Sequence, residues 1–245
     1  MSGALTLPGV DVAARPRGHL PTEESERQKA LGQFFTPPWL AAEVASIARC
    51  RGRVVLEPSA GNGRIVDACL DAGAARVVAV EFDPRFVAVL REKYEGRPVH
   101  VIGADFLELA RVGSQVKAEH EERWRIAECE SIVGNIPYTD GMDTAHLAAI
   151  ADLVCAGDVM ATLLCRTWAL HSKERWDGDG GKRGPGTWSR VALLESCPVV
   201  DRVPFEIADQ GADEGGMIDV SVFRFVDRRR AVGAARWLRP PEGQR

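Results

Sequence analysis

Val54–Arg64, with the sequence VVLEPSAGNGR, decides the fold class of this chain. Three apolar residues lead into the carboxylate of Glu57, a turn containing two glycines follows, and a helical pattern begins after the turn. A short apolar run of this kind is typical of a strand that is buried on both faces of a sheet. Gly61 and Gly63 let the backbone approach a ligand where a Cβ would collide. The stretch therefore predicts an α/β fold with a nucleotide-binding loop between a strand and a helix.

Two features of this loop choose between possible cofactors. The dinucleotide fingerprint has a third glycine three residues after the second, and here that position is Val66. Glu57 would repel a pyrophosphate, but its carboxylate can receive the ammonium group of a methionine moiety. The loop resembles motif I of class I S-adenosylmethionine-dependent methyltransferases. The resemblance implies S-adenosyl-L-methionine as cofactor, with contacts from Glu57, Ser59, Gly61 and Gly63.

The same resemblance implies a Rossmann-like seven-stranded class I methyltransferase sheet with helices on both faces and a C-terminal antiparallel strand pair. A chain of 245 residues is long enough for one such domain. We expect the domain at residues 22–227, between a loosely ordered tail at 1–21 and an Arg/Pro-rich tail at 228–245. The formal net charge of −4 requires no polyanionic partner, so a nucleic acid would bind at a local basic face.

Cysteine usage and hydropathy indicate a cytoplasmic protein. The six cysteines form no Cys-x-x-Cys pair and have no histidine at metal-ligand spacing, which is typical of thiols in a reducing compartment. The N-terminus has no basic-then-apolar signal, and no apolar run approaches the roughly 20 residues that span a bilayer. We therefore expect no membrane association and no metal site.

A second motif, Gly32–Pro37 with the sequence GQFFTP, precedes the Gly-rich loop. Thr36 followed by two prolines favours the start of a helix, with Thr36 as its N-cap and a proline in its first turn. The motif also resembles motif X of many adenine N6-methyltransferases. This resemblance implies that Gln33, Phe35 and Thr36 contact the methionine end of the cofactor.

Two acidic residues follow further apolar strands. Glu81 ends a strand predicted at residues 76–81, about 20 residues past the Gly-rich loop, where a carboxylate can accept both ribose hydroxyls. Asp105 and Phe106 follow a strand predicted at residues 99–102 and match motif III of the same enzymes. That match implies that Asp105 accepts from the adenine amino group of the cofactor and that Phe106 lies against the ring. Asp105 can serve as a helix N-cap at the same time.

Asn135-Ile136-Pro137-Tyr138 follows a fourth apolar strand and indicates the substrate class. An exocyclic amine is a poor nucleophile because its lone pair is delocalised into the base. The Asn135 side-chain oxygen and the Ile136 carbonyl, held by Pro137, can accept from the amine and aim its lone pair at a methyl group. Tyr138 can offer an aromatic face to the base and to the developing cation. Asn135 also belongs to the expected cofactor contacts, and such a site needs no strong general base.

The tetrapeptide resembles motif IV of adenine N6-methyltransferases but carries Ile136 where most of these have proline. Asn-Ile-Pro-Tyr is typical of ribosomal RNA adenine N6-dimethyltransferases, and Asn-Pro-Pro-Tyr also occurs in protein glutamine methyltransferases. Motif X favours DNA, so we expect transfer to the N6 of adenine in DNA. A ribosomal RNA adenine and the N5 of a protein glutamine are the alternative acceptors. A cofactor-binding regulatory subunit without transfer activity is a further alternative, against which the intact tetrapeptide argues. The sequence does not indicate whether a restriction partner exists.

The second half of the chain carries weaker signals. Basic and aromatic residues interleave over residues 166–188, where they could contact phosphates and stack a flipped base, or could equally be a solvated loop beside packed tryptophans. Residues 198–205 and 217–225 are predicted strands of the antiparallel pair. His146 falls within a helix predicted at residues 143–155 and is expected to carry no chemistry.

Overall fold

A computed structural model gives the three-dimensional structure of the protein and describes most of the predicted domain. The predicted tail at 1–21, Gln33, most of the basic and aromatic loop, and the tail from 228 onward except Arg229 lie outside the described residues. The described residues are 34–110, 126, 128–138, 142–157, 159–167, 190–199, 203–204, 206–207, 217–227 and 229.

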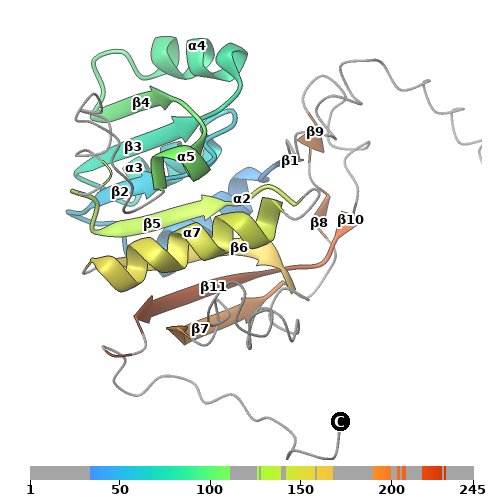
Figure 1. Ribbon diagram of the computed structural model, residues 1–245. Coiled ribbons are helices and arrows are strands. Elements are labelled where there is room, and N and C mark those ends of the chain that lie inside the picture. The colour runs from blue at the N-terminus through green and yellow to red at the C-terminus, as the bar shows by residue number, and fades with distance from the viewer. Residues whose placement is uncertain are drawn as a thin grey trace, which may run out of the picture.

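Seven strands form one sheet, and its topology confirms the predicted methyltransferase architecture (Figure 1). Five neighbouring strands, β4, β3, β2, β5 and β6, run parallel to one another. Strand β11 is antiparallel to both of its neighbours, β6 and β7. The antiparallel strands β7 and β11 are the predicted C-terminal pair. In spatial order the strands are β4 (Val99–Gly103), β3 (Arg76–Glu81), β2 (Val54–Glu57), β5 (Ser131–Asn135), β6 (Met160–Arg166), β11 (Val220–Asp227) and β7 (Val191–Pro198).

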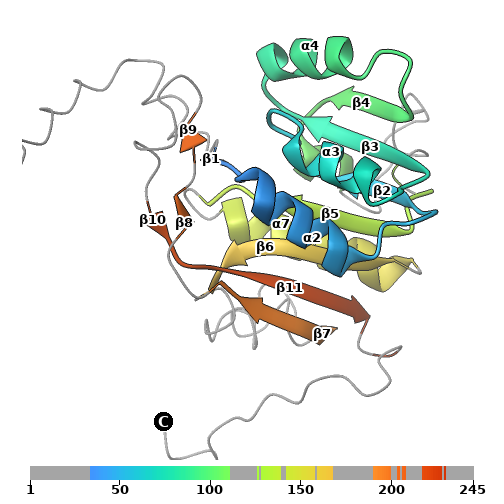
Figure 2. The same ribbon diagram turned by 180° about the vertical axis from the view of Figure 1, so that it is seen from behind.

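Helices cover both faces of the sheet, because successive strand residues point to opposite sides and build two cores. Leu56 and Ile132 belong to one core, while their chain neighbours Val55 and Val133 belong to the other. Figures 1 and 2 show the two faces in turn. The first core lies under α5 (Phe106–Ala110) and α7 (Met142–Ala156), and the second under α2 (Pro38–Ala48), α3 (Arg64–Asp71) and α4 (Pro84–Lys93).

Local sequence signals set the start of α4. The Asp83 carboxylate caps this helix by accepting from the Arg85 N–H at 3.0 Å, and Pro84 occupies the first turn. Both features are favoured at a helix N-terminus, where backbone N–H groups lack partners and proline needs none. The predicted helix start at Asp83 and Pro84 is therefore confirmed.

Two predicted boundaries are wrong. Thr36 does not cap α2, because Pro37 holds the N-cap position without a side-chain hydrogen bond and the Thr36 side chain is buried at the cavity described below. The sheet strand predicted at residues 198–205 is β7, which ends at Pro198 rather than beginning there. Pro198 lacks an N–H for the ladder, and one further hydrogen bond follows it, from the Val199 N–H to the Val220 carbonyl at 3.0 Å.

Four short strands make two small pairs beside the main sheet. They are β1 (Phe34–Phe35) with β9 (Glu206–Ile207), and β8 (Val203–Pro204) with β10 (Met217–Ile218). The first pair ties the motif X segment to the second half of the chain. All six cysteines are free thiols, as predicted, and four of them are buried. Among the described residues, no helix is long and apolar enough to cross a membrane.

Candidate active site

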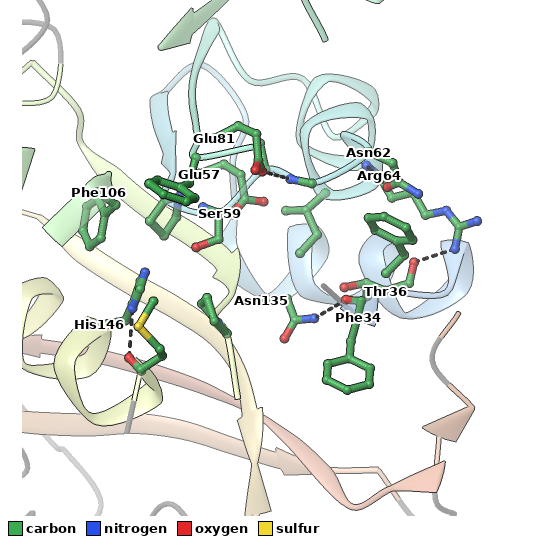
Figure 3. Close-up of a pocket in the computed structure, with 18 of the residues that line it drawn as sticks. Phe34, Thr36, Glu57, Ser59, Asn62, Arg64, Glu81, Phe106, Asn135 and His146 are labelled. Carbon is green, nitrogen blue, oxygen red and sulfur yellow. Dashed lines mark hydrogen bonds between the residues drawn. The ribbon is translucent and has the colours of Figure 1, made fainter. Parts of the chain in front are cut away.

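A cavity of about 250 Å³ lies at the carboxyl ends of the parallel strands (Figure 3). Glu57, Glu81 and Asn135 are the last residues of β2, β3 and β5, and Asp105 follows β4. Because parallel strands bring their carboxyl ends to one edge, the sheet gathers these side chains from distant parts of the sequence. The predicted site residues that line the cavity are Phe35, Thr36, Glu57, Ser59, Gly61, Glu81, Asp105, Phe106, Asn135 and Pro137.

Glu57 is a buried carboxylate in the cavity wall, with 1% of its surface exposed. Its Oε1 accepts from the Ser59 N–H at 3.0 Å. Gly134 of the neighbouring strand β5 lies next to the Glu57 side chain, and a Cβ on Gly134 would lie 2.7 Å from the Glu57 Oε1. Burial raises the pKa of Glu57 to about 8, and the charge of Glu81 adds to the rise. Among the described residues no cationic side chain pairs with Glu57. A buried carboxylate in this situation favours a positively charged ligand.

Glu81 holds the Gly-rich loop while facing the cavity. Its Oε2 accepts from the Gly61 N–H at 2.7 Å, and its Oε1 accepts from the Asp83 N–H at 2.7 Å. Burial raises the pKa of Glu81 even though these backbone hydrogen bonds oppose the rise. Each carboxylate oxygen keeps a further lone pair. Hydroxyl donors such as those of a ribose would match these acceptors.

The two loop glycines have different reasons for being glycine. Gly61 lines the cavity with φ +52°, and a Cβ there would lie 3.2 Å from the Phe35 ring. Gly63 has φ +84° but is not among the lining residues, and a Cβ on it would lie 2.4 Å from the Tyr94 hydroxyl. That hydroxyl donates to the Gly63 carbonyl at 2.8 Å. The structure therefore explains Gly63 by packing against α4 rather than by contact with the cavity.

Asp105 and Phe106 form the cavity wall at the start of α5. The Asp105 Oδ1 accepts from the Leu107 N–H at 2.8 Å, so Asp105 has the capping role that its position predicted. Phe106 is buried, and its ring stacks on the imidazole of His146 with centroids 5.5 Å apart and an interplanar angle of 26°. His146 comes from α7 and lines the same cavity, which the sequence did not predict.

Asn135 is held in one orientation by both ends of its amide. The Nδ2 donates to the Phe34 carbonyl at 3.2 Å, and the Tyr138 hydroxyl donates to Oδ1. Because Oδ1 has two lone pairs, it can accept a second hydrogen bond from a ligand. The two hydrogen bonds thus fix the amide at the part of the cavity wall that Asn135 and Pro137 form.

Tyr138 and Ile136 lie beneath this wall rather than in it. Both side chains are buried, with 4% and 1% of their surface exposed, and neither residue is among those lining the cavity. The Tyr138 ring stacks on Phe34 with centroids 6.4 Å apart, and the Arg166 guanidinium carbon lies 5.3 Å from the ring centroid. A face of Tyr138 for the target base, and an inward Ile136 carbonyl, therefore stay predictions.

The motif X segment packs against the Gly-rich loop. The Thr36 carbonyl accepts from the Arg64 guanidinium at 3.2 Å, which links β1 to the first residue of α3. Phe34, Phe35 and Thr36 all line the cavity. Phe35 and Thr36 thus lie where a contact with the cofactor is possible, as motif X predicted. Gln33 lies outside the described residues.

Several cavity residues were missed by sequence reasoning. Phe82 lines the cavity and leaves 64% of its surface exposed. Its position directly after the strand-end acid Glu81 was a sequence signal that could have identified it. Met142 and His146 reach the cavity from the first turns of α7. No sequence pattern distinguished their side of that helix, because both core and cavity residues satisfy the helical period.

These residues fit S-adenosylmethionine. Two buried carboxylates match a cationic methionine ammonium and the ribose hydroxyls, and the Gly61 backbone leaves space that a Cβ would fill. Phe82 and Phe106 supply apolar surface for a purine, and Asp105 supplies an acceptor beside it. Positive, polar and aromatic parts of the cofactor each have a counterpart in the wall.

Comparison with known proteins agrees with this fit. A putative RNA methyltransferase from Pyrococcus horikoshii has a similar structure, with a TM-score of 0.56, 19% identity, and coverage of 80% of this chain and 87% of the other. The chain therefore has the fold of class I S-adenosylmethionine-dependent methyltransferases. More narrowly, the family model described as ribosomal RNA adenine dimethylase matches residues 32–145, which include every predicted site residue.

The individual relatives include ribosomal RNA methyltransferases and a modification methylase. Ribosomal RNA small subunit methyltransferase A of Geobacter metallireducens is 35% identical over 51% of this chain and 43% of its own length. The enzyme of the same name from Chelativorans sp. is 28% identical over 82% of this chain and 69% of its own length. Modification methylase CviBIII of Paramecium bursaria Chlorella virus NC1A is 27% identical over 48% of this chain and 28% of its own length. The chain thus spans less than half of the first relative.

Proposed function

We propose that this protein transfers a methyl group from S-adenosylmethionine to the N6 amino group of adenine in RNA, with ribosomal RNA as the substrate class. The observation that carries the proposal is the fixed amide of Asn135 at the cavity wall. An oriented acceptor beside a cofactor cavity is what an exocyclic amine needs in order to react. We further propose that one domain at residues 22–227 performs the reaction, in the cytoplasm.

Asn135 would act on the amine directly. Its Oδ1 accepts one N–H of the target amine, while the hydrogen bonds from Tyr138 and to the Phe34 carbonyl prevent the amide from turning its Nδ2 toward the amine. The cofactor, when bound, supplies an electrophilic methyl on a sulfonium. Asn135 draws electron density of the amine out of the ring and directs the lone pair at that methyl. The proton leaves after transfer, when the nitrogen is acidic, so no strong base is required.

The other predicted residues would place the cofactor. Glu57 binds the methionine ammonium, and Glu81 accepts from the ribose hydroxyls. Asp105 and Phe106 hold the adenine of the cofactor. Ser59, Gly61, Phe35 and Thr36 shape the cavity around the methionine end. The buried carboxylates lie in a poorly hydrated part of the wall, where such polar contacts are stronger than in water.

The RNA substrate is favoured over the DNA substrate that motif X led us to expect. The family match and the small subunit methyltransferases support RNA, as does Ile136 in the tetrapeptide. The viral modification methylase supports DNA as the second candidate, because its similarity covers a comparable stretch of this chain. In either polymer the acceptor is the same adenine amine.

One experiment separates these substrates. The purified protein is incubated with tritiated S-adenosylmethionine and, in parallel, with unmethylated small-subunit ribosomal RNA, large-subunit ribosomal RNA, duplex DNA and single-stranded DNA. Recovery of N6-methylated or N6,N6-dimethylated adenosine from RNA is the expected result. N6-methyldeoxyadenosine alone would replace the proposal with the DNA reading. Cofactor binding without transfer to any of them would favour a glutamine acceptor or an inactive regulatory subunit.

Asn135→Ala is the matched control for that experiment. We expect transfer to fall by about a thousandfold or more, because an oriented hydrogen-bonding group is lost at the reacting atom. Binding of S-adenosylhomocysteine, measured by calorimetry, should change far less. Full activity of the variant would remove Asn135 from the mechanism.

A further inference from the structure

His146 carries a ring nitrogen with no partner among the described residues. Its Nδ1 lies 2.9 Å from the Met142 carbonyl oxygen, and the residue has only 3% of its surface exposed. Figure 3 shows the other ring nitrogen pointing from α7 into the cavity, on the side of Phe106 and Ser59. A ring nitrogen that faces a cavity without a protein partner can hydrogen-bond to a ligand there.

The hydrogen bond to Met142 fixes the tautomer of His146. A carbonyl oxygen can only accept, so the Nδ1 must carry the proton. In the neutral ring the Nε2 is then a bare acceptor. Burial lowers the pKa of His146, although the charges of Asp105 and Asp143 oppose that change, and the lowered pKa favours the neutral ring. His146 therefore offers an acceptor, not a donor, to the cavity.

The place of His146 identifies the kind of donor it can meet. Its ring stacks on Phe106, the residue next to Asp105 in the chain, and all three line the same cavity. Asp105 uses Oδ1 for the Leu107 N–H and keeps Oδ2 as a second acceptor at this place. Two acceptors beside one aromatic wall suit a group with two N–H bonds attached to a flat ring.

We infer that the Nε2 of His146 accepts a hydrogen bond from the 6-amino group of the cofactor's adenine, and that His146 and Asp105 together select adenine over purines without that amine. This inference rests on the proposed cofactor site and adds a residue that lies outside the motifs. The amine would donate one proton to each residue. A purine lacking the amine would leave both acceptors unpaired, which costs affinity.

The test compares two ligands on three proteins. The ligands are S-adenosylhomocysteine and its des-amino analogue, in which hydrogen replaces the 6-amino group. The proteins are the wild type, His146→Phe and His100→Phe. His146→Phe keeps an aromatic ring against Phe106 and removes the nitrogens. His100 lies on β4 and is not among the residues lining the cavity, so it controls for loss of a histidine. Calorimetry gives the six dissociation constants.

The wild type and His100→Phe should both prefer S-adenosylhomocysteine to the des-amino analogue. In His146→Phe the affinity for S-adenosylhomocysteine should fall about tenfold, the value expected for one hydrogen bond lost in a desolvated site. Its affinity for the des-amino analogue should equal or exceed that of the wild type, because the variant has one unpaired acceptor fewer. Retained affinity for the analogue also shows that the cavity of the variant is intact.

Two results would overturn the inference. An unchanged affinity of His146→Phe for S-adenosylhomocysteine would mean that Nε2 makes no contact with the amine. An equal loss for both ligands would mean that His146 only packs against Phe106. If the wild type binds neither ligand, the proposed cofactor site itself fails, and that result is distinct from a failure confined to the His146 variant.

Discussion

At the scale of single residues, the site depends on polar groups that are held before any ligand arrives. The Asn135 amide is oriented from both ends, and Glu81 is fixed by two backbone N–H groups. Such preorganised groups need not reorient during a reaction, which is why they are effective in catalysis. Two predictions follow from the surroundings of Tyr138 and Glu57.

Tyr138 should act as a positioning residue through Asn135. Tyr138→Phe keeps the ring between Phe34 and Arg166 but removes the hydroxyl that donates to the Asn135 Oδ1. We expect kcat to fall by about tenfold or more, because the amide loses one of its two anchors. The KM for S-adenosylmethionine should stay nearly constant. Steady-state kinetics with the accepted RNA measure both, and a change confined to KM would contradict this role.

Glu57 should make the ligand-free protein less stable as the pH rises. Its pKa is about 8 in the folded protein against 4.5 as the ordinary value, so between these two pH values the folded state binds a proton that the unfolded state has released. Stability therefore falls as the pH rises through this window. Glu57→Gln removes the contribution, which amounts to a few kcal/mol.

Urea unfolding at pH values of about 5, 6.5 and 8 tests this prediction. The free energy of unfolding of Glu57→Gln should increase relative to that of the wild type each time the pH is raised. Glu81 keeps its own raised pKa in both proteins, so the variant should retain some pH dependence. A constant difference between the two proteins across the range would show that Glu57 does not titrate there.

At the scale of elements, the junction between β2 and α3 is the most constrained part of the fold. Gly63 adopts a left-handed backbone and packs against Tyr94 and Leu90 of the α4 segment. The strand end, the loop and the helix are thereby locked to the next βα unit. This contact helps to fix the conformation of the loop.

Gly63→Ala should therefore destabilise the protein by about 2 kcal/mol or more, since it combines backbone strain with a steric clash. The Cβ would lie 2.4 Å from the Tyr94 hydroxyl and 2.9 Å from the Leu90 Cδ2. Combining Gly63→Ala with Tyr94→Phe removes the nearest clashing atom, so the two losses should be less than additive. Thermal unfolding of the two single variants and the double variant checks this. Strict additivity would show that strain alone sets the cost.

At the scale of the whole molecule, β11 joins the edge strand β7 to the other five strands of the sheet. It lies between β6 and β7, and its Phe223 and Phe225 are fully buried in the core beneath α5 and α7. Phe223→Ala should cost about 3–5 kcal/mol, which is typical for a large cavity in a packed core. Urea unfolding measures the loss. A loss below about 1 kcal/mol would mean that this strand contributes little to the common core.

The sequence by itself determined the fold class, and most of the residues that it predicted for the site line one cavity. Continuous apolar strands that end in Glu57, Glu81 and Asn135 specify an α/β sheet with polar groups at one edge, because the apolar runs and the Gly-rich turn are local properties. The limits of β7 were misplaced, since an apolar run beside Pro198 is compatible with a strand on either side of the proline.

Only the tertiary structure decided which residues share the cavity. His146 reaches it because α7 packs beside α5, and Tyr138 turns beneath Asn135 because its ring packs on Phe34, which is distant in sequence. Gly63 is not among the residues lining the cavity and packs against Tyr94 instead. Contacts between residues far apart in the chain depend on how the elements pack, and no local period or motif encodes that packing.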